Sequence, residues 1–131
     1  MIPETWTPVR RGDELVGYLE TAPTGSIPRL LTGSALDAAH PRTEAIAVLE
    51  ARGLPELDRV HWARLPHPLP AGRFAAAAPE RDWHWTEVAI VDVTDAECTV
   101  RPRSADPGAP ESLAVLPVPV AGLLRREAPE R

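Results

Sequence analysis

The chain has 131 residues, a formal net charge of −5 at pH 7 and a single cysteine. This length fits one domain, and its content of Leu, Ile, Val and Phe lies just above the level of about 20% at which disorder becomes the default expectation. All 14 basic residues are arginine, and no basic run exceeds two residues, so nucleic-acid binding is disfavoured. One cysteine excludes an intramolecular disulfide framework. No apolar run approaches the roughly 18 residues that span a bilayer.

The first part of the chain is typical of antiparallel strands. Residues 5–20 predict a β-hairpin with a turn at 11–14, because strand-forming residues flank a Gly-Asp pair. With that turn, Val9 would lie opposite Val16. A third strand is expected near 27–31.

A helix is predicted over residues 41–52. Pro41 suits a first helical turn, and Ala45, Ile46 and Leu49 form one apolar stripe. Gly53 would then be the left-handed residue that ends the helix, because a proline follows two residues later.

The second half of the chain is again rich in strand patterns. We expect a strand at 60–65, a long Pro/Ala loop at 66–82, a hairpin pairing 88–93 with 98–102, and a last strand at 112–116. A further turn is expected at 104–111.

The second hairpin predicts its own register. Pairing Val93 with Cys98 places Val91 opposite Val100 and makes one face apolar on both strands. Cys98 should therefore be buried and act as a small apolar side chain rather than as a nucleophile.

These elements predict an α+β fold. We expect a mostly antiparallel curved sheet or small open barrel of about six to seven strands, with one main helix at about 41–52. Residues 1–126 would form a single globular domain, and residues 127–131 a frayed tail.

The most distinctive tripeptide is Trp83-His84-Trp85, and Trp62 is expected on the neighbouring strand. The tryptophans could complete a core that contains one Phe and one Tyr, or they could form a binding surface. Alternation along the strand places Glu87 on the same face as Trp83 and Trp85. If it is buried there, Glu87 is a candidate general acid or base; otherwise it lies at the rim of the sheet or pairs with an arginine.

No common hydrolase, nucleotide-binding or metal motif occurs in the sequence. Glu87 and His84 are the catalytic candidates, and neither belongs to a recognisable relay. The four histidines have no standard metal-ligand spacing, so we expect no metal site and no cofactor.

Four short segments of the chain form a loose pattern: Trp6-Thr-Pro-Val9, Leu15-Val-Gly-Tyr-Leu19, Leu31-Thr-Gly-Ser-Ala-Leu36 and Ala51-Arg-Gly-Leu54. With these segments the chain resembles a loosely defined group of small actinobacterial hypothetical proteins. That resemblance implies no activity, no catalytic residues and no cofactor.

The absence of catalytic signatures, together with surplus tryptophan, favours a non-enzymatic protein-interaction module that is either homodimeric or bound to another protein. Trp62, Trp83 and Trp85 are the expected binding residues. The alternative is a small enzyme or small-molecule binder with a pocket near these tryptophans, His84 and Glu87. A cytoplasmic location is expected, with no membrane partner, because the N-terminal residues lack the pattern of a signal peptide.

Overall fold

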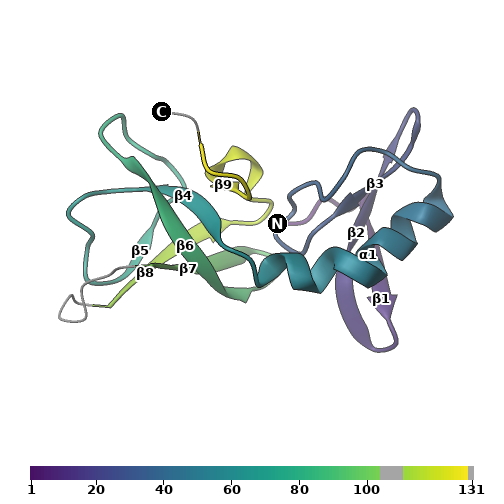
Figure 1. Ribbon diagram of the computed structural model, residues 1–131, viewed down its shortest axis with the longest axis horizontal. Helices are drawn as coiled ribbons and strands as arrows, with labels where there is room; N and C mark the ends of the chain where they lie inside the picture. The colour runs from purple at the N-terminus through teal and green to yellow at the C-terminus, as the bar shows by residue number, and fades with distance from the viewer. Residues whose placement is uncertain (104–110, 130–131) are drawn as a thin grey trace.

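The computed structural model describes residues 1–103 and 111–129. This part of the chain forms one α-helix and nine strands. The strands make two sheets, and neither sheet closes into a barrel. Figure 1 shows the two sheets side by side, with the helix packed on the smaller sheet and extending toward the larger one. The predicted α+β class is therefore confirmed. No helix in the described residues has the length and apolar character needed to cross a membrane.

The smaller sheet has the order β1-β2-β3 and is antiparallel throughout. Its strands and the helix that covers it are β1 (Thr7–Arg11), β2 (Glu14–Ala22), β3 (Gly25–Arg29) and α1 (Arg42–Leu57). The apolar stripe of the helix packs on this sheet, since Ala45 and Leu49 are fully buried in the same cluster as Val16 and Leu19. This burial gives the N-terminal half a core of its own.

The larger sheet has the order β5-β8-β7-β6-β4-β9, and only the β5–β8 pair is parallel among the described strands. Its strands are β4 (His61–Leu65), β5 (Gly72–Ala75), β6 (His84–Val93), β7 (Glu97–Pro102), β8 (Ser112–Pro117) and β9 (Leu124–Arg125). One side of this sheet carries the second core, which includes Ala63, Leu65, Val88, Cys98 and Val100. A 3-10 turn, η1 (Ala121–Leu123), leads into β9.

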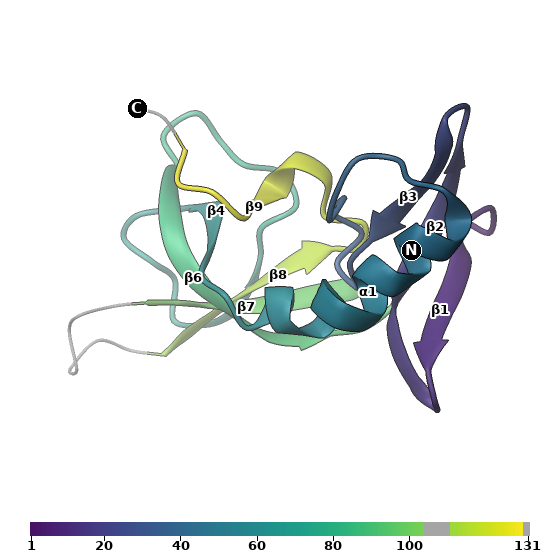
Figure 2. The same ribbon diagram turned by 45° about the vertical axis from the view of Figure 1, so that its right-hand side comes forward.

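The two halves lie next to each other (Figure 2), and several polar contacts join them. The N–H of Val120 donates to the carbonyl of Thr32 at 2.9 Å. Farther along the chain, the Arg126 guanidinium donates to Glu56 of α1 at 3.2 Å and to the carbonyl of Ala35 at 3.0 Å. The C-terminal segment is therefore anchored to both the helix and the loop that precedes it.

The helix is longer than the sequence predicts. It runs to Leu57, so Gly53 lies inside it and is not the left-handed residue that ends it. A Cβ built on Gly53 would lie 2.6 Å from the carbonyl oxygen of Val16. Glycine is therefore needed here because the helix approaches the backbone of β2, and not because the helix stops.

In the first hairpin the predicted turn is confirmed but the predicted pairing beyond it is wrong. Arg11 pairs with Glu14, yet a bulge between Val9 and Arg10 shifts the register by one residue. Val9 consequently lies opposite Gly17 rather than Val16. The extra residue in a bulge cannot be recognised from alternation alone.

A bulge has the same effect in the second hairpin. Val93 pairs with Cys98 as predicted, but Val100 lies opposite Ile90 because Val91 is the unpaired residue. Val91 is 47% exposed instead of facing the core. The predicted Val91–Val100 pair is therefore wrong.

The predicted loop at 66–82 contains a strand. Residues Gly72–Ala75 form β5, which lies parallel to β8 at the edge of the larger sheet. Four residues without clear alternation give little local signal, and their pairing depends on a strand 40 positions later. Most of the turn expected at 104–111, and part of the tail expected at 127–131, lie outside the described residues.

Cys98 is fully buried, as predicted, and burial raises the pKa of its thiol to about 12. The thiolate, which is the reactive form, is therefore strongly disfavoured in the folded protein. We expect native Cys98 to react with a thiol reagent at pH 8 at least about 100-fold more slowly than in the denatured chain, since labelling requires local opening. Stopped-flow labelling with and without guanidinium chloride measures this ratio, and equal rates would show that β7 is misplaced.

Candidate binding face

The two sides of β4 differ sharply in burial. His61, Ala63 and Leu65 are fully buried, whereas Trp62 and Arg64 between them are half-buried. Because successive side chains point to opposite faces of a sheet, Trp62 and Arg64 lie on the side away from the core.

The neighbouring strand places Trp85 and Glu87 on that same outer side. In the β4–β6 register, Trp62 lies opposite Glu87 and Arg64 lies opposite Trp85. Strand β9 pairs with the other edge of β4, and there Arg125 lies opposite Trp62. Directly opposite residues share a face of the sheet. We call this group the tryptophan–arginine face: Trp62, Arg64, Trp85, Glu87 and Arg125.

Arg125 stacks on the aromatic part of the face. Its guanidinium carbon lies 4.5 Å from the centroid of the Trp85 ring, within the range of cation–π attraction. The Arg125 side chain is exposed, so its edge remains open to a ligand. This contact thus holds a positive charge against an apolar ring.

Arg64 supports the face in a different way. Its guanidinium donates to the backbone carbonyl of Glu80 at 2.7 Å, and longer bonds reach the carbonyls of Arg81 and Trp83. These bonds tie the turn before β6 to β4. The arginine therefore fixes the backbone just before Trp85.

Glu87 is not a buried acid. Its side chain is 43% exposed, and its Oε2 lies 4.0 Å from Nε of Arg103. Glu87 lies on the outer side of the sheet, whereas Val88 lies on the core side. The predicted placement of Glu87 on an apolar core face is therefore wrong, and the alternative, an exposed position next to an arginine, is what the structure shows.

Trp83 and His84 do not join this face. Trp83 precedes β6 and packs against the core of the larger sheet. His84 lies opposite Leu65 on β4, on the other side of the sheet from Glu87, and its exposed ring stacks on His67 with the centroids 5.0 Å apart. The two catalytic candidates are thus separated by the sheet.

The other two histidines have separate environments. Nε2 of His40 lies 3.2 Å from Oδ2 of Asp37. His61 is buried, and its Nδ1 lies 2.7 Å from the carbonyl oxygen of Arg59. Burial lowers the pKa of His61. Within residues 1–103 and 111–129, no group of three or more His, Cys, Asp or Glu side chains is placed to hold a metal ion.

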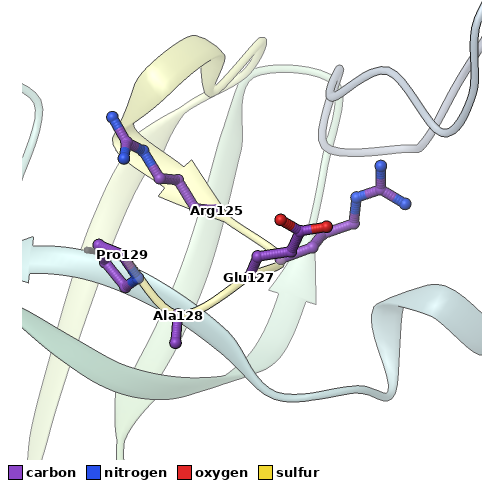
Figure 3. Close-up of a pocket in the computed structure, with 5 residues that line it drawn as sticks. Arg125, Glu127, Ala128 and Pro129 are labelled. Atoms are coloured by element: carbon purple, nitrogen blue, oxygen red, sulfur yellow. The ribbon is translucent and has the colours of Figure 1, made fainter.

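A pocket of about 430 Å³ adjoins the face at Arg125. The C-terminal segment forms it, and its lining residues are Arg125, Arg126, Glu127, Ala128 and Pro129. Figure 3 shows the side chains of Arg125 and Glu127 rising from the segment, with Ala128 pointing away from them.

A smaller pocket of about 280 Å³ lies between β2 and the β6–β7 turn, and Leu15, Tyr18 and Asp95 are among its lining residues. Burial, and next the charge of Asp95, raise the pKa of Tyr18. Glu87 lines neither pocket.

Sequence reasoning found Trp62, Trp85 and Glu87 but missed the two arginines between them. Arg64 follows Trp62 by two residues, so alternation on β4 was a usable signal. Arg125 had no such signal, because its position depends on β9 returning to pair with β4.

Comparisons with known proteins identify no relative of this chain. No family model, no curated protein and no solved structure matches the chain. The resemblance to small actinobacterial proteins therefore stays a prediction, and we argue function from the arrangement of side chains.

Proposed function

We propose that this protein is a non-enzymatic protein-interaction module that binds a partner protein through the tryptophan–arginine face. The observation that carries this proposal is that Trp62 and Trp85 lie on the outer side of the larger sheet, opposite its core. Tryptophan and arginine are the residues that most often dominate binding energy at protein interfaces. A cytoplasmic location belongs to the same proposal.

The charges on the face favour a different protein over a second copy of this chain. A symmetric dimer would press the same patch on both subunits together, and this patch holds two arginines, Arg64 and Arg125, against one acid, Glu87. Like charges that meet at an interface oppose association. A homodimer through this face is therefore the less favoured form of the proposal.

The enzyme alternative receives less support from the geometry. His84 and Glu87 lie on opposite sides of the sheet. A general acid or base must lie within reach of a bound substrate. The face offers area and charge for contact, but no enclosed group of catalytic side chains.

Site-specific cross-linking tests the proposal. A photoreactive benzoylphenylalanine at position 87 lies on the face and leaves both tryptophans in place, whereas the same residue at exposed position 47 lies on α1. In the organism that encodes the chain, we expect a discrete protein partner to be captured at least about 10-fold more strongly from position 87, because hot-spot contacts are local. Equal capture from both positions, or capture from neither, would contradict the proposal. Capture of this chain alone would identify a homodimer instead.

A further inference from the structure

We propose that the partner presents an acidic segment, and that its carboxylates bind the Arg125 guanidinium at the junction of the tryptophan–arginine face and the adjoining pocket. This inference rests on the proposed function and adds the chemistry of the partner.

The two successive arginines have different partners. Arg126 makes its hydrogen bonds within the protein, because it donates to Glu56 and to the carbonyls of Ala35 and Leu36. Arg125 is exposed, and its guanidinium carbon lies 4.5 Å from the centroid of the Trp85 ring, a cation–π contact that restricts the guanidinium without requiring its N–H donors. A preoriented guanidinium loses less side-chain freedom when it forms paired N–H···O bonds with a carboxylate.

The pocket gives such a carboxylate room beside the guanidinium. It is an open pocket of about 430 Å³ along the segment from Arg125 to Pro129, whose side chains Figure 3 shows. Ala128 and Pro129 contribute apolar wall, and Glu127 contributes a negative charge. Glu127 should therefore weaken the binding of an acidic ligand, which gives the proposal a variant with an effect of opposite sign.

Charge complementarity selects the class of partner. The chain carries a net charge of −5, yet at the face and its adjoining pocket the arginines Arg64, Arg103 and Arg125 outnumber the acids Glu87 and Glu127. A local positive patch on an acidic protein attracts an acidic segment there and repels it elsewhere, which fixes the orientation of binding. A nucleic acid would present similar negative charge, but binding along a strand needs a longer basic stripe than this patch supplies.

Fluorescence anisotropy with defined peptides tests the inference. The probes are labelled (Glu-Pro)6, the uncharged (Gln-Pro)6, the basic (Lys-Pro)6 and a 12-residue oligothymidine, each titrated with the full chain. We expect (Glu-Pro)6 to bind at least about 10-fold more tightly than (Gln-Pro)6 in 25 mM NaCl and to weaken in 200 mM NaCl, because exposed charges are screened by salt. Equal affinity for the two peptides, or tighter binding of oligothymidine, would overturn the inference.

Charge variants then locate the site. Arg125→Gln should weaken (Glu-Pro)6 binding about 10-fold, whereas Glu127→Gln should tighten it about threefold. Arg42→Gln makes the same charge change at an exposed position at the start of α1 and should leave the affinity unchanged. Equal weakening by Arg42→Gln, or weakening by Glu127→Gln, would overturn the assignment to Arg125. Capture from position 87 without any peptide preference would leave the proposed function standing and overturn this inference alone.

Discussion

Replacing Gly17 by alanine should lower the free energy of unfolding by about 3 kcal/mol, the largest single-residue effect that we expect in the N-terminal half. A Cβ at this position would overlap the carbonyl oxygen of Arg29 and lie 2.7 Å from Cδ2 of Leu49. The strand lies between its neighbour β3 and the helix, so it cannot move away from one contact without worsening the other. Thermal unfolding should show a decrease in Tm of roughly 10 °C.

Gly122 supplies the matched control for this substitution. A Cβ there meets no atom within 4 Å in the described structure. Gly122→Ala should therefore leave Tm almost unchanged. If Gly17→Ala is equally harmless, α1 does not pack on β2 as closely as the structure shows.

Replacing Glu56 by alanine should lower the free energy of unfolding by about 2 kcal/mol, because the change leaves the Arg126 guanidinium without its counter-charge at the junction of the two halves. The Glu56 side chain is only 9% exposed, and it accepts hydrogen bonds from Arg126 at 3.2 Å and from Arg59 at 3.5 Å. Without the carboxylate, Arg126 keeps its bonds to the carbonyls of Ala35 and Leu36 but loses its counter-charge.

Urea denaturation, followed by tryptophan fluorescence and by circular dichroism, measures this effect. Glu50→Ala is the control, because Glu50 is exposed on the same helix. We expect the midpoint to fall for Glu56→Ala and to stay fixed for Glu50→Ala. Identical midpoints for the two variants would mean that the Glu56–Arg126 pair does not help to hold the C-terminal segment to α1.

The sequence predicts those features of the fold that depend on neighbouring residues. Both hairpin turns were found, since a Gly-Asp pair and the Val93–Cys98 closure are local signals. The strands at β4 and β8 were found for the same reason. The two bulges were missed, because one extra residue, Val16 on β2 or Val91 on β6, leaves the local composition unchanged while reversing the faces beyond it.

Features that depend on distant contacts could not be predicted. Gly53 has the sequence context of a helix end, yet it lies within α1 because the backbone of β2 passes beside it. The prediction that Trp85 and Glu87 lie on the core face of β6 was also wrong. The core lies on the side of Val88, so Trp85 and Glu87 point outward. Arg125 enters the candidate site only through the pairing of β9 with β4.

The central claim is that Trp62 and Trp85 serve binding, whereas Trp83 serves folding. The double variant Trp62→Thr/Trp85→Thr keeps strand-forming residues on the outer side of the sheet, and Trp83→Thr makes the same change against the core. Loss of a core-packed tryptophan typically costs about 3 kcal/mol, whereas outward-facing positions cost about 1 kcal/mol.

The most direct measurement is therefore the melting temperature of each variant together with partner capture from position 87. We predict that the double variant melts within about 5 °C of the wild type and loses the captured partner, and that Trp83→Thr melts roughly 10 °C lower. A double variant that unfolds outright, or that keeps its partner at full yield, would contradict the assignment of the tryptophan–arginine face as the binding surface.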